Sequence, residues 1–411
     1  MNTSIRIRLS IMMFLQYFIW GSWYVTMYTF LSQTQKFPDG QIGLAYGTTA
    51  LAAMISPFFV GMIADRFFAT EKVLCFLHCA GGVLLYLASQ QTSFWGFYAL
   101  LLAHTLCYMP TMALTNSLSF SHMTDTGKQF TGIRVLGTIG WIAAGLLVGA
   151  MKIEAAKTPM VIGAVASIVM GVFCLCLPHT PPKAAGEPVS VRAVLGLDAL
   201  SLLKDRSFAI FALSSFMICI PLAFYYNLTN GFLNELNVQN AAGKMTMGQM
   251  SELFFMLVFP FFFSRLGIKK MLMAGMLAWA VRYLLFAYGN SQSLVWMLYL
   301  GIILHGVCYD FFFVTGQVYV DNQASEKIRS AAQGFIAFIT YGSGMFVGSL
   351  IQGKVAGMYA LQPSGHNWRS IWIIPAGGAA AVLILFVLFF QSKDKKQLKS
   401  VPAMDPVAIA E

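Results

Sequence analysis

Residues 9–31 have the sequence LSIMMFLQYFIWGSWYVTMYTFL, an apolar run without a charged side chain. A helix needs about 20 mostly apolar residues to cross the hydrocarbon core of a bilayer, so this run is long enough to span it. The run follows Arg6 and Arg8, but it is too long for the core of a signal peptide and no small-residue cleavage site follows it. We therefore predict that it stays in the protein as the first membrane helix.

The whole chain has the composition of a membrane protein. Of its 411 residues, 58% are hydrophobic and only 10% are charged, whereas soluble domains have about 25% charged residues. A soluble fold could not bury so much apolar surface, so lipid must cover part of it. We predict an all-α membrane protein with twelve transmembrane helices, at approximately residues 9–31, 40–64, 72–91, 95–121, 133–151, 159–178, 207–233, 246–265, 270–289, 293–320, 330–357 and 369–391.

The basic residues indicate a membrane topology rather than nucleic-acid binding. The net charge is +10, but Lys and Arg are scattered over the short links between predicted spans. With a cytoplasmic N-terminus, the opposite face receives only Lys36, Lys152, Lys157, Lys244, Lys354 and Arg369. The others fall on the cytoplasmic side, apart from Arg282 within a span, and this is the usual bias of membrane proteins. We expect both termini in the cytoplasm and no nucleic-acid partner.

The chain divides into two halves around its longest predicted cytoplasmic link. Short patterns recur in the same order on both sides of it: LCYM at 106–109 and VCYD at 307–310, IR at 133–134 and 328–329, and an arginine at 66 and 265. Within the link, residues 195–203 have the pattern of an amphipathic helix on the membrane surface. We predict an N-terminal six-helix bundle at 1–178, a linker at 179–206, a C-terminal six-helix bundle at 207–391 and a cytoplasmic tail at 392–411.

Several strings in the sequence resemble a known family. Two parallel six-helix repeats are the architecture of the major facilitator superfamily, and GMIADR at 61–66 resembles its loop between helices 2 and 3, although Phe67 replaces a glycine. More specific strings are QYFIWGSW at 16–23, YMPT at 108–111, IRVLGTIG at 133–140, LGLD at 195–198, FSRLGIKK at 263–270, YDFF at 309–312 and AAQG at 331–334. With these strings the chain resembles the nucleoside:proton symporter family of bacterial nucleoside and xanthosine permeases, which implies the major facilitator fold.

Two acidic residues lie well inside predicted spans, Glu252 in the eighth and Asp310 in the tenth. A charge at the bilayer centre costs about 2.5–3.5 kcal/mol even on the lenient insertion scale, so such residues usually face a partner or a water-filled cavity. A carboxyl whose surroundings change during transport can bind a proton on one side and release it on the other. We assign proton coupling to these two residues. The alternative is a static ion pair of either acid with Arg282.

Helical spacing brings other polar and aromatic residues together. Arg134, Thr138 and Trp141 form one stripe of the fifth span, and Gln249 shares a face with Glu252. Aromatic side chains suit stacking on a nucleobase. Amide and carboxylate groups suit hydrogen bonds with ribose hydroxyls and base edges.

The tenth span also combines aromatic and polar side chains on one face. His305 and Tyr309 share a face, with Asp310 one step around the helix. The family resemblance implies binding residues at Arg134, Thr138, Trp141, Gln249, Glu252, Tyr309 and Asp310. The chain departs from the family in helix 7, where Ala223 and Tyr226 replace amide side chains beside Asn227, and in helix 10, where His305 replaces a tyrosine. We therefore predict a substrate site of Arg134, Thr138, Trp141, Tyr226, Asn227, Gln249, Glu252, His305, Tyr309 and Asp310.

These features favour a carrier over other classes of membrane protein. We predict a monomeric proton-coupled symporter that imports nucleosides by alternating access across the bacterial inner membrane. A carrier of another hydroxylated solute, such as a sugar, would use similar side chains. A membrane-embedded enzyme is less well supported, because the sequence has no His-x-x-x-His motif and no Ser/His/Asp grouping. The seven cysteines lie in apolar runs without metal-ligand spacing, so we expect no metal and no cofactor. A sensor would need a soluble output domain beyond the short tail.

Overall fold

The computed structural model describes residues 2–182, 197–326 and 328–391, and its regular elements are all helices. The first half contains α1 (Thr3–Trp23), α2 (Met27–Thr29), the π-helix η1 (Phe30–Thr34), α3 (Asp39–Arg66), α4 (Thr70–Ser89), α5 (Phe94–Ser121), α6 (Thr126–Met151) and α7 (Thr158–Cys174). The second half contains the 3-10 helix η2 (Leu197–Lys204), α9 (Arg206–Glu235), α10 (Ala241–Tyr288), α11 (Val295–Tyr309), η3 (Asp310–Val314), α12 (Thr315–Gln323), α13 (Arg329–Ala337), η4 (Phe338–Gly344), α14 (Met345–Met358) and α15 (Trp368–Phe389).

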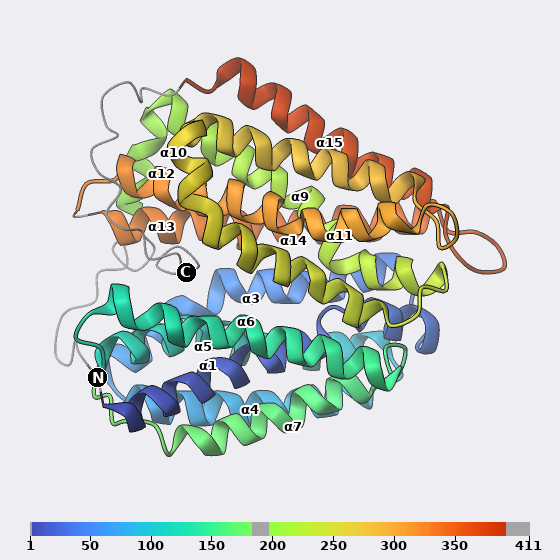
Figure 1. The fold of residues 1–411 in the computed structure, drawn as a ribbon. Coiled ribbons are helices and arrows are strands. Elements are labelled where there is room, and N and C mark those ends of the chain that lie inside the picture. Colours follow the sequence, from blue (N-terminus) through green and yellow to red (C-terminus); the bar gives the residue numbers. More distant parts are fainter. Residues whose placement is uncertain (1, 183–196, 327, 392–411) are drawn as a thin grey trace.

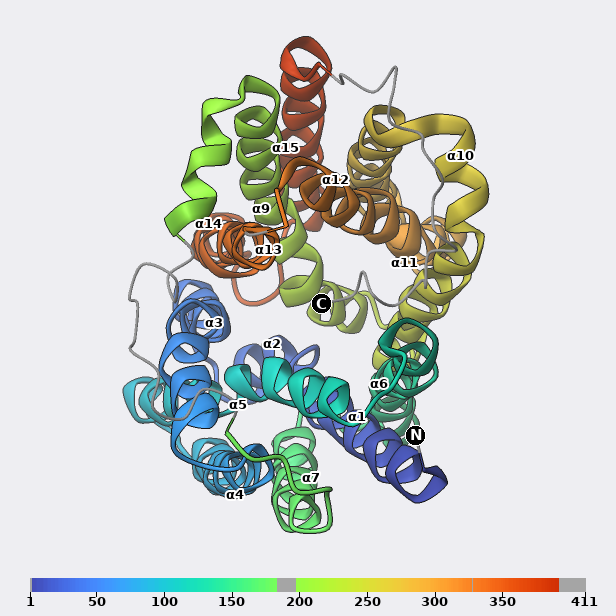
Figure 2. The ribbon, with the colours of Figure 1, turned by 90° about the vertical axis from the view of Figure 1, so that its left-hand side faces the viewer.

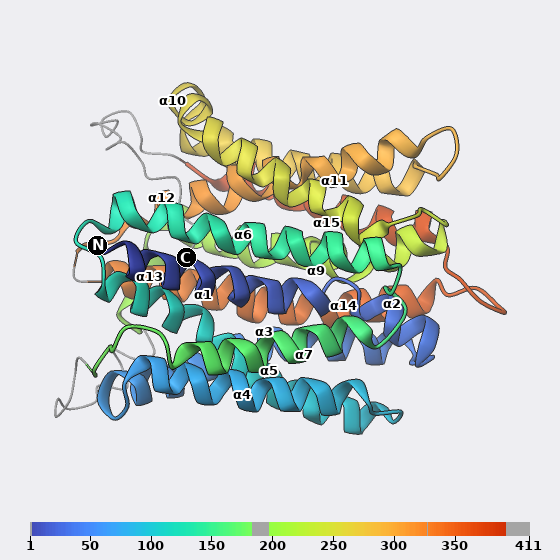
Figure 3. The same ribbon diagram turned by 60° about the horizontal axis from the view of Figure 1, so that its bottom comes forward.

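The helices form two groups that lie side by side. Elements α1 to α7 make the first group and α9 to α15 the second (Figures 1 and 2). The long helices run along one common direction (Figure 3). We call the end of the molecule where α1 begins and α15 ends the near end. The opposite end, with α2 and residues 359–367, is the far end (Figure 1).

Several helices in the described part of the chain are long and apolar enough to cross a membrane. Eight stretches within the described residues meet this criterion: α4, α5, Gly132–Met151 of α6, α9, α10, Val295–Gln323, Arg329–Met358 and α15. Helix α7 is apolar but shorter. Large apolar side chains also remain outside the packed interior, including Phe76, Leu257 and Leu388 with exposed fractions of 69%, 74% and 67%. The prediction of an all-helical membrane protein is thus confirmed.

Helix α10 contains two of the predicted spans and doubles back between them (Figures 1 and 3). Its backbone leaves the helical conformation at Gly267, where φ is 67° and ψ is 174°. Residues other than glycine rarely adopt a positive φ because their Cβ clashes with the backbone. The chain therefore reverses direction at this glycine, within the predicted link between residues 265 and 270.

The first predicted span, residues 9–31, is wrong as a single helix. Helix α1 ends at Trp23, and the chain continues through turn residues into α2 and η1. The cause is a side chain inserted into the helical hydrogen-bond ladder. The backbone N–H of Tyr28 donates to the hydroxyl of Tyr46 at 3.0 Å, and that hydroxyl donates to the carbonyl of Tyr24 at 2.9 Å. The hydroxyl thereby replaces the direct bond between residues 28 and 24, and such insertions interrupt helices.

The linker and the loop after the second span are described only in part. Residues 183–196 lie outside the described residues, and so do the side chains of Met62, Asp65 and Arg66 in the family-like loop. The amphipathic helix predicted at 195–203 corresponds, in its described part, to the 3-10 helix η2. Its Ala199 is buried whereas Leu200 is 44% exposed, so η2 has one packed face and one exposed apolar face.

The two groups approach each other closely toward the far end, where small residues allow it. A Cβ atom on Gly43 of α3 would lie 2.5 Å from the carbonyl oxygen of Ser349 and 2.8 Å from Cα of Gly353, both in α14. A Cβ on Gly149 of α6 would lie 2.6 Å from the backbone nitrogen of Gly243 in α10. Contacts this short exclude any larger side chain while the groups are together.

Candidate substrate cavity

A cavity of about 310 Å³ lies between the two groups of helices. Sites for small molecules usually have volumes of roughly 300–1,000 Å³ and apolar walls with a few polar groups. The first group contributes Tyr17, Trp20, Tyr24, Tyr46, Thr49, Ala50, Ala53, Met109, Met112, Arg134, Thr138 and Trp141. The second group contributes Leu222, Tyr226, Gln249, Glu252, Tyr309, Tyr341, Met345 and Ser349.

The stripe predicted on the fifth span lines the first-group wall. Arg134, Thr138 and Trp141 of α6 all face the cavity. The guanidinium carbon of Arg134 lies 4.1 Å from the centre of the Tyr17 ring, a distance at which a cation is attracted to an aromatic face. Trp141 meets the ring of Trp20 edge to face at 5.5 Å. Tyr17 and Trp20 of α1 thus hold Arg134 and Trp141 of α6 in position at the cavity wall.

Helices α9, α10, α11 and α14, with η4, provide the opposite wall. Gln249 and Glu252 of α10 both line the cavity, and the side chain of Glu252 is 18% exposed. Tyr226 of α9 lies beside them. The hydroxyl of Tyr309 on α11 shares a 2.6 Å hydrogen bond with the hydroxyl of Tyr341. A cation on one wall and a carboxylate with an amide on the other can bind an uncharged ligand rich in hydroxyl groups.

Three of the ten predicted site residues lie behind the lining. Asn227 is buried and its amide nitrogen donates to Ser349 at 3.1 Å and to Gln352 at 3.2 Å, so it joins α9 to α14. His305 is completely buried. Asp310 is also completely buried, at the start of η3, and neither of its carboxylate oxygens has a hydrogen-bond partner.

The alternative of a static ion pair with Arg282 is not formed among the described residues. Arg282 instead donates to the carbonyl of Gly301 at 2.8 Å and lies 3.3 Å from a ring nitrogen of His305. Glu252 lies 3.8 Å from the other ring nitrogen of His305. Neither deep acid therefore forms an ion pair with Arg282 in this conformation.

The family profile described as nucleoside H+ symporter matches residues 1–395. The chain belongs to this family. YegT of Escherichia coli (strain K12) is 45% identical over 403 residues, covering 95% of this chain and 94% of YegT. The xanthosine permease of the same organism is 34% identical over 417 residues, covering 96% of this chain and 98% of the permease.

Solved structures agree with this assignment. Two crystal structures of nucleoside transporter NupG, one of them a mutant, match the symporter with TM-scores of 0.89 and 0.87 at 33% sequence identity. The matches cover 94% and 96% of this chain and 100% of each NupG chain. The fold is the major facilitator fold predicted from the sequence, and the protein is a transporter and not an enzyme.

Sequence reasoning missed the aromatic residues that α1 brings to the cavity. Tyr17, Trp20 and Tyr24 line it, and none of the three is among the predicted site residues. Their spacing of three and four residues places them on one helical face, as for the stripe on α6. That spacing is the signal that could have found them. Tyr46 and Tyr341 gave no such signal, because each is a single aromatic residue of its helix at the cavity.

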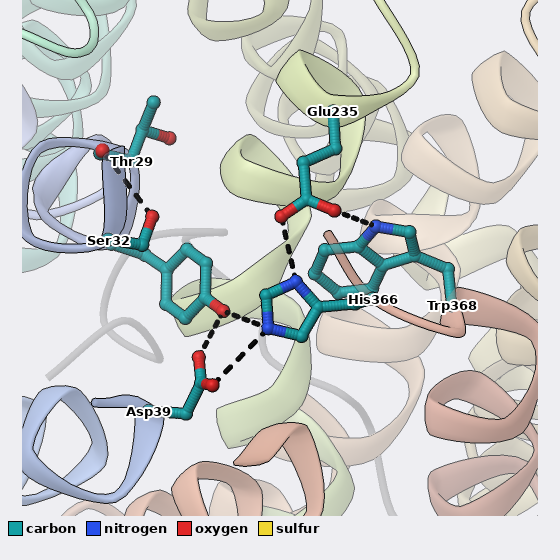
Figure 4. A network of polar contacts seen from close by, with 7 residues as sticks. Thr29, Ser32, Asp39, Glu235, His366 and Trp368 are labelled. Atoms are coloured by element: carbon teal, nitrogen blue, oxygen red, sulfur yellow. Dashed lines mark hydrogen bonds and ion pairs between the residues drawn. The ribbon is translucent and has the colours of Figure 1, made fainter. Parts of the chain in front are cut away.

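A polar cluster joins the two groups of the symporter at the far end (Figure 4). His366 lies between two carboxylates: its Nδ1 is 2.8 Å from Glu235 of α9 and its Nε2 is 3.3 Å from Asp39 of α3. The other oxygen of Asp39 accepts a 2.5 Å hydrogen bond from the hydroxyl of Tyr28. Trp368 donates from its indole nitrogen to Glu235 at 2.8 Å. We call these five residues the far-end cluster.

A second set of polar contacts joins the groups beside this cluster. Glu154, which follows α6, accepts hydrogen bonds from Asn230 at 2.9 Å and Asn234 at 2.6 Å, both on α9. It also accepts one at 2.9 Å from the backbone N–H of Ala242. The hydroxyl of Thr29 donates to Asn230 at 2.6 Å. Side chains from far-apart positions in the sequence thus hold the far end together.

Proposed function

We propose that the protein imports nucleosides together with protons across the bacterial inner membrane by alternating access. The observation that carries the substrate class is the cavity between the two helix groups, with Trp141 and Tyr226 as stacking surfaces and Arg134, Gln249 and Glu252 as hydrogen-bonding groups. A nucleoside combines a flat base with a ribose rich in hydroxyls, and these two kinds of side chain match its two parts. The family and its relatives, a xanthosine permease and the nucleoside transporter NupG among them, support the same substrate and proton coupling.

We assign the near end to the cytoplasm and the far end to the outside. The bias of Lys and Arg along the sequence supports this orientation. The apolar runs and the patterns that recur in both halves support twelve spans in two six-helix repeats, at 1–178 and 207–391, joined by a cytoplasmic linker at 179–206 and followed by a cytoplasmic tail at 392–411. Each repeat then carries one wall of the cavity, so a single chain suffices for transport and we propose a monomer.

The contacts between the groups support an inward-facing state. The polar contacts between described residues of the two groups, from Asp39 to His366 and from Glu154 to Asn230, lie at the far end. A closed far end leaves the near end as the route from the cavity. Separation of the far-end contacts would then open the cavity to the outside.

Within this mechanism the predicted site residues have separate tasks. Arg134, Thr138, Trp141, Tyr226, Gln249, Glu252 and Tyr309 line the cavity and contact the nucleoside. Asn227 and His305 act from behind the wall, through the side chains they touch. Asp310 and Glu252 carry the proton, because a carboxyl without a fixed cationic partner can exchange a proton when its surroundings change between states.

Uptake measurements test the substrate class. Radiolabelled uridine is supplied to a nucleoside-transport-deficient strain that expresses the protein, with purine nucleosides, pyrimidine nucleosides and sugars as competitors. We expect nucleosides of both kinds to compete and sugars not to compete. Binding of a sugar to the purified protein, together with failure of every nucleoside to bind, would overturn the assignment.

A further inference from the structure

A buried cation lies directly behind the second-group wall of the cavity. Arg282 of α10 is completely buried. Its guanidinium carbon lies 3.3 Å from the centre of the Tyr225 ring, and its Nε donates to the carbonyl of Gly301 at 2.8 Å. Its Nη1 lies 3.3 Å from Nδ1 of His305. The aromatic face and the carbonyl hold the guanidinium in one position, so the contact with His305 has a defined direction.

The direction of this contact fixes which nitrogen of His305 carries the proton. A guanidinium has only donors, so Nδ1 of His305 must be the acceptor. A doubly protonated ring would place a second cation against Arg282, which is unfavourable where both are buried. The ring is therefore neutral with its hydrogen on Nε2. That nitrogen lies 3.2 Å from the hydroxyl oxygen of Tyr226 and 3.8 Å from Glu252, so the hydroxyl is the partner within hydrogen-bond distance.

The consequence reaches the cavity through Tyr226. Because its oxygen accepts from His305, its own O–H hydrogen is free for another acceptor, and Tyr226 lines the cavity. We infer that Arg282 and His305 make the Tyr226 hydroxyl a hydrogen-bond donor toward the substrate, and that this selects nucleosides with a carbonyl oxygen at the facing base edge over those with an amino group. The inference rests on the proposed function and names the substrate class within it.

The position of Tyr226 favours the base rather than the ribose as its partner. Its ring lies 6.5 Å from the ring of Tyr24 on the first-group wall, so it belongs to the aromatic part of the cavity. The carboxylate of Glu252 and the amide oxygen of Gln249 are acceptors, which suit the hydroxyl hydrogens of a ribose. An amino group facing the Tyr226 hydroxyl would place donor against donor, and such a mismatch is a usual source of specificity.

Two pairs of nucleosides test this selection, because each pair exchanges a carbonyl oxygen for an amino group at one position of the base, together with the hydrogen on the adjacent ring nitrogen. Inosine has a carbonyl oxygen where adenosine has an amino group, and uridine has one where cytidine has an amino group. We expect the purified protein to bind the carbonyl member about tenfold more tightly, the effect of one good hydrogen bond against one mismatch. In Tyr226→Phe the two members of each pair should bind within about twofold of each other.

A matched control separates this effect from the loss of any tyrosine hydroxyl. Tyr341 also lines the cavity, but its hydroxyl is paired with that of Tyr309. Tyr341→Phe should leave the carbonyl preference unchanged, whatever it does to affinity. A preference that persists in Tyr226→Phe, or that disappears equally in Tyr341→Phe, overturns the inference.

Two further variants test whether His305 and Arg282 orient the hydroxyl of Tyr226. His305→Phe keeps a ring against Tyr225, on which His305 now stacks at 4.9 Å, but removes both nitrogens. We expect it to bind nucleosides with the preference reduced to about twofold. Arg282→Lys keeps a cationic donor for Nδ1 and should retain the preference, whereas a purely structural role of Arg282 would lower the affinity for both members of a pair alike.

The outcomes distinguish this inference from the proposed function. If no nucleoside binds the wild-type protein, the proposed function fails. If nucleosides bind but inosine and adenosine bind equally, and uridine and cytidine also bind equally, the proposed function stands and the donor relay from Arg282 to Tyr226 is wrong. Tyr226→Phe keeps the test informative even if the His305 or Arg282 variants do not fold.

Discussion

Raising the pH from about 7 to about 10 should separate the two helix groups at the far end, because His366 then loses the proton that joins them. A ring that donates to Glu235 from Nδ1 and to Asp39 from Nε2 must carry both hydrogens. Burial lowers the pKa of His366, but the hydrogen bonds and negative charges of Asp39 and Glu235 outweigh burial and raise the pKa from 6.5 to about 9.

The size of the effect follows from which contacts are lost on separation. Glu235 belongs to the same helix group as His366 and stays beside it, so only the share of Asp39 is lost. If that share is about half of the rise from 6.5 to about 9, it is worth about 1.7 kcal/mol, or roughly a ten- to twentyfold change in the ratio of joined to separated molecules. The pKa is raised in the joined state, so this stabilisation is fully present at neutral pH and is lost as the pH rises through about 9.

Distances between spin labels measure this ratio directly. Gln33 in the first group and Ser364 in the second are exposed at the far end and can carry the labels. We expect the long-distance population to grow roughly ten- to twentyfold relative to the short one between pH 7 and pH 10, and His366→Gln to remove this pH dependence. His179→Gln is the matched control, because His179 pairs with Glu71 at 2.8 Å within the first group. A distance distribution that does not change with pH in the wild type, or that still changes in His366→Gln, would refute the reasoning.

Other substitutions test the cavity and the closure of the far end. Arg134→Ala should abolish nucleoside uptake while folded protein remains, because it removes the cation of the first-group wall; size-exclusion chromatography and uptake check this. Asp310→Asn should lose accumulation driven by a proton gradient in proteoliposomes while it retains nucleoside exchange. Glu252→Gln should mainly weaken nucleoside affinity, by about tenfold or more if a charged hydrogen bond is lost. Gly43→Ala should lower transport by preventing closure of the far end, whereas Gly40→Ala, with open space around its Cβ, should not.

The sequence predicted the helices better than it predicted their interruptions. Apolar runs of spanning length indicate membrane helices because lipid requires them, and the break near residue 267 could be placed from its charged neighbours. The end of α1 at Trp23 could not be placed. It depends on the hydroxyl of Tyr46, which belongs to another helix, and no local pattern shows that a side chain will enter the backbone ladder.

Helical spacing predicted which residues share a face but not how far each side chain reaches the cavity. On α6 the spacing of Arg134, Thr138 and Trp141 was sufficient, because all three point the same way. On α11 the residue that lines the cavity is Tyr309, and successive residues on a helix differ by about 100°. Asp310 is therefore turned into the packed interior, where it is completely buried.

The contacts that close the far end could not be predicted from the sequence either, for a different reason that also bears on transport. Asp39 and His366, like Thr29 and Asn230, come from opposite halves of the chain, so only the assembled fold brings them together. These contacts are hydrogen bonds and ion pairs, and on separation water can replace each partner, so each contributes only about 1 kcal/mol net. An apolar interface would resist separation by roughly 25 cal/mol for every Å² exposed. A far end closed by polar side chains can thus be stable as observed and still open within each transport cycle, as the proposed alternating access requires.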